Sequence, residues 1–197
     1  MATFPEGVFH AHSRALQDLF DSRRIADRLV EKLMRAQFSD EDRAFIARQS
    51  LFFLASADAQ GRPDCSYKGG DPGFVRVVEP DTLAFPSYDG NGMFKSLGNI
   101  SANPHVGLLF IDFQAPKRLR VNGQASLHLD DALKAEYPGA QAIVRVRAEQ
   151  IFPNCPRYIH RMQLVEPSPY VPVAGTAAPV PAWKENPAFK DALPRQD

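Results

Sequence analysis

The sequence has few cysteines and no excess of either charge. Cys65 and Cys155 are its two cysteines, and neither belongs to a Cys-x-x-Cys pair. This excludes a zinc knuckle and a disulfide framework, and we expect both thiols to be free and buried. Lysine plus arginine (23) equal aspartate plus glutamate (23). Zero net charge argues against a protein that binds nucleic acid or anionic lipid by bulk electrostatic attraction.

Long apolar runs are also missing. No stretch approaches the roughly 20 apolar residues of a membrane span, and the first residues lack the basic-then-apolar order of a signal peptide. We therefore expect no membrane partner and a cytoplasmic location. Hydrophobic residues make up 44% of the chain and include 14 phenylalanines. That composition favours one globular domain over residues 1–197.

Common catalytic motifs are absent as well. The chain contains no Gly-x-Ser-x-Gly and no His-Glu-x-x-His. Segment 90–96 reads G-N-G-M-F-K-S, which is close to both the dinucleotide fingerprint and the phosphate loop. However, Lys95 stands where the fingerprint needs its third glycine, and no glycine directly precedes Lys95 and Ser96. Neither motif is met.

Hydrophobic spacing predicts helices in residues 13–48. Apolar residues recur at helical intervals from Ser13 to Met34, which predicts a long amphipathic helix with a break near Asp21 and Ser22. A second helix is predicted to begin at Ser39, whose side chain can cap it, because acidic residues fill the following turn.

The rest of the chain is typical of a β protein. Short apolar or alternating runs predict strands at 51–57, 62–68, 74–78, 82–85, 106–113, 119–129 and 142–152, with a short helix over 93–101. About six short strands with few helices between them favour an antiparallel barrel or sandwich over a parallel sheet. The proline-rich tail, 166–197, predicts an extended arm that packs on the body or on a partner, with a disordered tail as the alternative.

Three cationic segments indicate where an anion would bind. The glycine loop before Lys95 and Ser96 places backbone amides and a lysine at the start of a helix, which is the outline of a phosphate site. Lys68 precedes a second glycine-rich loop, and residues 117–120 form a third cationic group. The alternative for each is a solvated charge at a turn or strand end.

Taken together, the motifs resemble a known family. The run N-P-H-V-G-L-L-F at 103–110 is followed by L-R-V-N-G at 119–123, and K-G-G-D-P-G-F-V-R at 68–76 precedes both. Over roughly residues 40–165, this pattern resembles the pyridoxamine 5'-phosphate oxidase-like flavin-binding family.

The resemblance implies an α+β fold that is mainly β. It would be a six-stranded antiparallel split β-barrel over 50–152, with N-terminal helices and a short C-terminal helix at 153–165. It also implies an obligate homodimer with FMN held at the subunit interface. A small barrel cannot enclose a flavin ring, so a second subunit is expected to close the groove.

The resemblance also assigns cofactor-binding residues. The FMN phosphate would lie against the strand and loop before the short helix, and Arg118 would contact the flavin near its pyrimidine edge. The complete expected set is Lys68, Pro86, Ser87, Asn91, Phe94, Lys95, Ser96, Arg118, Arg120, Cys155 and Arg157, with no metal ligand. The register of Lys68 with the phosphate-binding strand is open by a few residues.

Two departures separate this sequence from true pyridoxamine phosphate oxidases. Residues 88–92 replace their arginine-rich loop, and their C-terminal tryptophan and Arg-x-His signature is missing. Segment 152–161 looks instead like the helix of a separate flavin-nucleotide-binding branch, with Asn154 as its cap. In that helix, Arg157 or Arg161 would face an anionic flavin or substrate, and Arg157 and His160 are the catalytic candidates.

The functional hypothesis is therefore an FMN-dependent oxidoreductase. Such an enzyme would pass electrons or hydride between a reduced nicotinamide donor, NADH or NADPH, and a small-molecule substrate. The alternative is a non-catalytic split barrel that binds flavin, deazaflavin or haem. Haem needs an axial ligand, for which His105, His128 and His160 are available. A structural or regulatory dimer without ligand is the third class.

Overall fold

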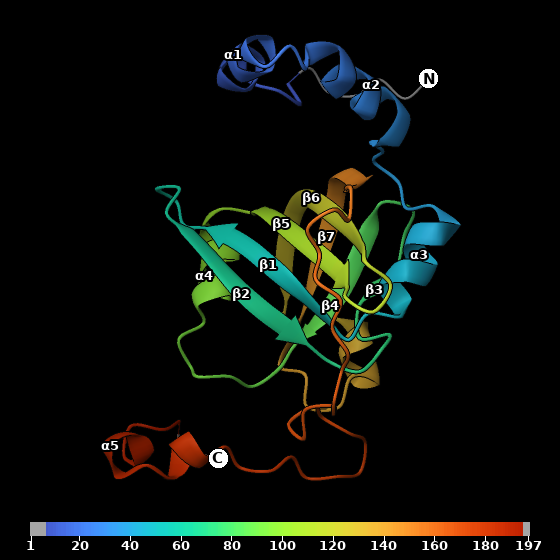
Figure 1. Ribbon diagram of the computed structural model, residues 1–197. Coiled ribbons are helices and arrows are strands. Elements are labelled where there is room, and N and C mark those ends of the chain that lie inside the picture. The colour runs from blue at the N-terminus through green and yellow to red at the C-terminus, as the bar shows by residue number, and fades with distance from the viewer. Residues whose placement is uncertain (1–6, 195–197) are drawn as a thin grey trace.

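One antiparallel sheet of seven strands forms the body of the protein in this computed structural model, which describes residues 7–194 (Figure 1). The strands follow the order β2-β1-β5-β6-β7-β4-β3. Their bounds are β1 (Leu51–Ala57), β2 (Pro63–Gly69), β3 (Arg76–Val77), β4 (Thr82–Ser87), β5 (His105–Asp112), β6 (Lys117–His128) and β7 (Ala142–Pro153).

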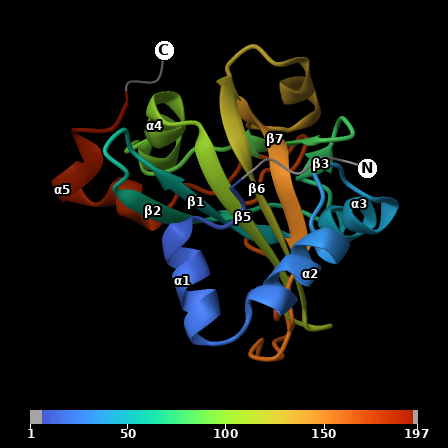
Figure 2. The same ribbon diagram turned by 90° about the horizontal axis from the view of Figure 1, so that it is seen from above.

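The helices lie outside this sheet. They are α1 (Ala11–Leu19), α2 (Arg23–Leu33), α3 (Asp40–Ala47), α4 (Lys95–Ala102) and α5 (Pro187–Lys190), with short 3₁₀ helices η1 (Ala132–Glu136) and η2 (Ala182–Glu185). Seen from above, α4 and α5 lie on the side of β2, and α3 lies on the side of β3 (Figure 2). Within residues 7–194, no helix has the length and apolar character that crossing a membrane requires.

Alternation along the strands builds the core. Every second residue of β1 and β5 is buried, and Phe52, Phe74, Phe85 and Phe110 meet inside the curved sheet. The ring centroid of Phe52 lies 5.9 Å from that of Phe74, 4.9 Å from Phe85 and 5.2 Å from Phe110. A strand buried on one face shows this period of two, and the opposite positions remain on the outer face.

The structure confirms the antiparallel sheet predicted from the sequence and corrects the strand number that the resemblance implies and the length of one strand. The sheet is antiparallel and has seven strands, one at each run predicted from the sequence, rather than the six of the split barrel that the resemblance implies. Of the strand predicted at 74–78, only Arg76 and Val77 form, and they pair with β4. Among the residues that the structure describes, the edge strands β2 and β3 are not paired with each other, so the barrel is open.

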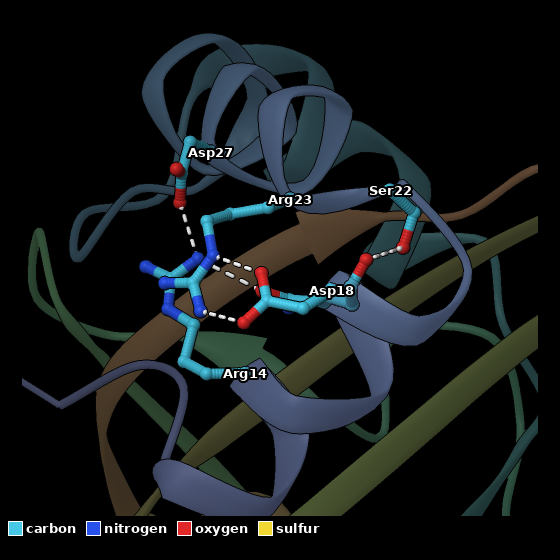
Figure 3. Close-up of polar contacts among 6 residues, drawn as sticks. Arg14, Asp18, Ser22, Arg23 and Asp27 are labelled. Atoms are coloured by element: carbon cyan, nitrogen blue, oxygen red, sulfur yellow. Dashed lines mark hydrogen bonds and ion pairs between the residues drawn. The ribbon is translucent and has the colours of Figure 1, made fainter.

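α1 and α2 confirm the helical structure predicted from hydrophobic spacing and the break predicted within it. α1 and α2 are separated at Asp21, which has a positive φ of 49°. Their side chains form ion pairs, Arg14 to Asp27 at 2.6 Å and Arg23 to Asp18 at 2.5 Å (Figure 3). No residue of either helix is buried, and both stand apart from the sheet (Figure 1). The amphipathic pattern therefore predicted the helices but not a surface that covers their apolar face.

The helix predicted to begin at Ser39 is present as α3. Ser39 and Asp42 form a reciprocal capping box, in which the Ser39 side chain accepts from the Asp42 amide and the Asp42 carboxylate accepts from the Ser39 amide. Arg35 also donates to Asp42. Asp42 is therefore a buried carboxylate whose charge is balanced.

A second balanced carboxylate ties the β6–β7 connection to β7. Asp131 is 5% exposed, and the Arg145 guanidinium donates to both of its oxygens at 2.6 and 3.1 Å. The Arg145 hydrogen bond holds the pKa of Asp131 below its usual value. A lowered carboxyl pKa adds stability above the unfolded pKa of about 3.9, and that stability is lost as pH falls through the folded pKa.

We therefore expect D131N to lower the free energy of unfolding by about 1–2 kcal/mol at pH 7 and by much less at pH 3. Urea denaturation at the two pH values measures the difference. D130N is the matched control, because Asp130 is exposed and adjacent, and its effect should be near zero at both. A difference in the free energy of unfolding between D131N and the wild type that is as large at pH 3 as at pH 7 would contradict this account.

Candidate functional site

Edge strand β2 turns one row of polar side chains towards α4. Asp64, Ser66 and Lys68 pair in register with Ser56, Leu54 and Phe52 of β1, so they share the face that β1 directs inwards. The glycine-containing loop between β4 and α4 lies opposite. A cleft of about 420 Å³ opens between them, lined by Asp64, Ser66, Lys68, residues 87–94, Lys95, Ser96 and Leu97.

Lys68 is the centre of the polar network in this cleft. Its Nζ donates to Ser66 Oγ at 2.9 Å and lies 3.5 Å from Ser96 Oγ, and the two serine oxygens are 3.0 Å apart. Burial lowers the pKa of the Lys68 ammonium, more than the nearby Asp64 charge raises it. A partly desolvated ammonium that is bonded to hydroxyls rather than to a carboxylate favours an anionic ligand.

The N-terminus of α4 adds backbone donors to the same cleft. Phe94 is its N-cap and makes no side-chain capping bond, so the first amides of the helix are not satisfied by a cap. Phe94 also has a positive φ of 47°, which a bulky residue rarely adopts. Amides, helix dipole and Lys95 together make this end of α4 suited to a phosphate.

The structure brings together most of the residues predicted to hold the phosphate. Lys68, Ser87, Asn91, Phe94, Lys95 and Ser96 all line the cleft. Pro86 is buried on β4, directly before Ser87.

Ser66 and Asp64 line the same cleft but were missed from the sequence. Both stand at alternate positions with Lys68 on β2. That period of two was the available signal, because residues two apart on a strand share a face. Ser96 Oγ lies 3.4 Å from Asp64 Oδ2, so the carboxylate joins the hydrogen-bonded group.

Arg118 and Arg120 lie elsewhere, on the outer face of β6. Leu119 and Val121 between and beside them are buried, so the arginines alternate outwards. Arg118 Nε is buried and has no hydrogen-bond partner in the described chain. The Arg120 guanidinium lies 5.9 Å from the centre of the Phe152 ring. The two arginines do not line the cleft.

The register aligns a mostly aromatic and apolar row beside Arg120. Tyr67, Phe53, Leu109, Arg120 and Phe152 are cross-strand partners in succession from β2 to β7. Phe53 packs edge-on against Tyr67, with ring centroids 6.2 Å apart, and Tyr67 is 61% exposed. This outer row is an aromatic surface with a cation at its far side.

The helix predicted at 153–165 is wrong. Residues 154–165 are irregular and mostly exposed, including Cys155, Arg157 and His160. The segment buries too few side chains to offset the cost of ordering it as a helix. The structure does not bring these three residues to the cleft. The expected burial of both thiols is also wrong, because Cys65 faces outwards on an edge strand and both cysteines are exposed.

A second, mostly apolar cleft of about 430 Å³ lies on the other face of α4. Phe94 and Leu97 line both clefts, and Leu127 and Leu129 at the end of β6 complete the apolar wall.

Within residues 7–194, no three His, Cys, Asp or Glu side chains gather closely enough to hold a metal ion. The donor set of the first cleft, hydroxyls, amides and ammonium groups, therefore suits an anion.

The fold is an open antiparallel barrel with a polar cleft between its edge strand β2 and the N-terminus of α4. The model of the family described as pyridoxamine 5'-phosphate oxidase matches residues 38–166, which is more than half of the chain. The chain belongs to this family. The match begins just before α3, runs through the whole sheet and ends after β7.

Solved structures with a similar fold are more distant. HupZ of Group A Streptococcus is 21% identical, with a TM-score of 0.48, over 59% of this chain and 93% of that one. HutZ, the haem storage protein of Vibrio cholerae, is 20% identical, with a TM-score of 0.44, over 59% and 94%. An FMN-binding protein of Syntrophomonas wolfei is 15% identical, with a TM-score of 0.43, over 74% and 98%. No curated protein matches the chain.

Proposed function

We propose that the protein binds FMN, with the phosphate in the cleft between β2 and α4. The observation that carries this proposal is Lys68, a partly desolvated ammonium hydrogen-bonded to Ser66 beside the uncapped start of α4. Family membership over residues 38–166 supports a flavin nucleotide as the source of the phosphate.

Each residue of the cleft has a role in holding such a group. Lys68 and Lys95 supply positive charge, and the hydroxyls of Ser66, Ser87 and Ser96 donate hydrogen bonds to phosphate oxygens. The first amides of α4 donate from the helix side. The Asn91 side chain accepts from the Met93 amide at 3.0 Å, which fixes the loop that carries these groups.

The cleft of about 420 Å³ offers mainly charged, hydroxyl and amide groups, which suit the phosphate end of FMN better than the flavin ring. We therefore propose that a second copy of the chain covers the flavin ring and that the protein works as a homodimer. In this arrangement Arg118 and Arg120 bind the ring from the outer sheet face, and the exposed Cys155 and Arg157 act across the interface.

We also propose that the whole chain is one domain that works as an oxidoreductase. Bound FMN would supply hydride and electron transfer between NADH or NADPH and a small-molecule acceptor. Among this chain's own groups, Lys68 and Lys95 hold the anionic end of the cofactor, and the unpartnered Arg118 Nε is a donor for the ring.

Matched titration with FMN and riboflavin tests the binding proposal. The two ligands share the ring and the ribityl chain and differ in the phosphate, so we expect FMN to bind roughly 100-fold more tightly or better. Flavin fluorescence and the absorption spectrum of the purified protein give the measurement. Equal affinities would contradict a phosphate site, and a protein that stays colourless with FMN would contradict flavin binding altogether.

Steady-state oxidation of NADH or NADPH separates the enzyme from a non-catalytic flavin carrier. With FMN bound, a steady decrease of the reduced nicotinamide supports the oxidoreductase. A flat trace with each of several acceptors supports the carrier. Haem is the alternative ligand of such a carrier: His105, His128 and His160 are exposed and line neither cleft described above, so an axial histidine would place a haem outside both clefts.

A further inference from the structure

The charges that line the phosphate cleft cancel. Lys68 and Lys95 are positive, and Asp64 and Asp89 are negative. Hydroxyls and helix amides supply hydrogen bonds, but a phosphate also gains from a positive potential. The carboxylate of Asp89 stands in the loop that borders the ligand, where it opposes the charge of the two lysines.

A residue from the far end of the chain contacts this carboxylate. Lys184 Nζ lies against Asp89 Oδ2, and the two residues are separated by 95 positions in sequence. Figures 1 and 2 both place the η2–α5 end of the chain beside the loop that leads into α4. The Lys184 side chain is 23% exposed, so it is more enclosed than a freely solvated lysine.

The segment that carries Lys184 is a small ordered unit, here called the C-terminal cap, residues 182–190. Within it Trp183 and Phe189 pack edge to face with centroids 6.5 Å apart, and Lys190 pairs with Glu185 at 3.0 Å. Asn186 caps α5. These internal contacts hold the backbone of the cap, so Lys184 is presented to Asp89 from an organised support.

We propose that Lys184 is a part of the anion site, because it neutralises Asp89 and changes the cleft from zero to one net positive charge. The C-terminal cap then acts on the cleft from outside its lining, through the contact of Lys184 with Asp89. An exposed pair of this kind contributes little to folding stability. Its effect is therefore expected in ligand affinity rather than in the free energy of unfolding. The inference rests on the proposed phosphate ligand.

A double-mutant cycle tests this role. We expect K184A to weaken FMN binding roughly three- to tenfold at low salt, and less at high salt, because one compensating charge is lost. D89N should bind FMN as well as the wild type or better. In the double variant, K184A should cost less than twofold, because without the Asp89 carboxylate Lys184 is no longer held beside the cleft. K32A is the control, since Lys32 lies on α2 and pairs with the adjacent Glu31, and it should leave FMN affinity unchanged.

The outcomes separate this inference from the proposed function. If the wild type binds FMN and K184A binds it equally well, the role of Lys184 is wrong and the FMN site stands. If the double variant is as weak as K184A alone, Lys184 acts by another route and the neutralisation is wrong. If the wild type does not bind FMN, the wild type and the same variants are titrated with inorganic phosphate instead. Phosphate binding that K184A weakens and D89N restores then supports the charge role without flavin, and no phosphate binding overturns it.

Discussion

Replacing Lys68 with methionine is expected to weaken FMN binding by roughly 30- to 1,000-fold, which corresponds to about 2–4 kcal/mol. The ammonium lies in a partly desolvated position with hydroxyl partners at 2.9 and 3.5 Å. A charge-assisted bond to phosphate is stronger there than at the surface. Methionine keeps the length of the aliphatic stem, so the variant removes the charge with little change in packing.

The K68M substitution should not lower the thermal stability of the protein without FMN. Burial disfavours the charged form of Lys68, so K68M should unfold at the same temperature as the wild type or higher. A merely structural lysine would lose stability instead. Riboflavin affinity should be unaffected, because riboflavin has no phosphate. K117M, at an exposed lysine on β6, is the matched control and should change neither quantity.

The lowered pKa of Lys68 also predicts how FMN affinity depends on pH. Loss of the Lys68 proton removes the positive charge, and it occurs at a lower pH than the value of about 10.4 for an ordinary lysine. FMN affinity should therefore fall on the alkaline side before an ordinary lysine titrates. K68M should lack this step. An identical alkaline decrease in K68M and the wild type would show that another group is responsible.

The sequence was sufficient for the elements that local chemistry determines. The capping box at Ser39, the break at Asp21 and the alternating strands follow from residues close together in the chain. The sequence also predicted six residues that line the cleft, which are Lys68, Ser87, Asn91, Phe94, Lys95 and Ser96. For Lys95 and Ser96 the signal was local, because a glycine loop before a lysine and a serine indicates an anion site without tertiary information.

Tertiary contacts determine what the sequence missed. Ser66 reaches Ser96 only because β2 pairs with β1 in one register and α4 packs against that edge. Lys184 reaches Asp89 across 95 positions, for which the sequence carries no local signal. The helix expected after β7 was inferred from resemblance, and its absence is explained by the lack of buried side chains in this segment. The prediction that Cys65 is buried was wrong, because Cys65 lies on the outer face of the edge strand β2.

Gly123 is the position at which the sheet tolerates a side chain least. The register of β6 with β7 shifts between Asn122 and Gly123, so that Asn122 pairs with Gln150 and Gly123 with Ala148. This bulge bends the two long strands and increases their twist. A Cβ at Gly123 would lie 2.1 Å from the Arg147 carbonyl oxygen and 2.9 Å from its carbon. The neighbour is backbone rather than a flexible side chain, so it can move only if the bulge itself opens.

We therefore expect G123A to lower the free energy of unfolding by roughly 3 kcal/mol and Tm by roughly 6–12 °C. G98A is the matched control: Gly98 lies inside α4 with open space around its Cβ direction, so alanine there should stabilise the protein by about 0.5–1 kcal/mol. Thermal unfolding of both variants measures the contrast. Equal effects of the two substitutions would contradict the close backbone approach at the bulge. Because β2, which carries Lys68, does not pair with β6, the G123A protein that remains folded should keep its preference for FMN over riboflavin.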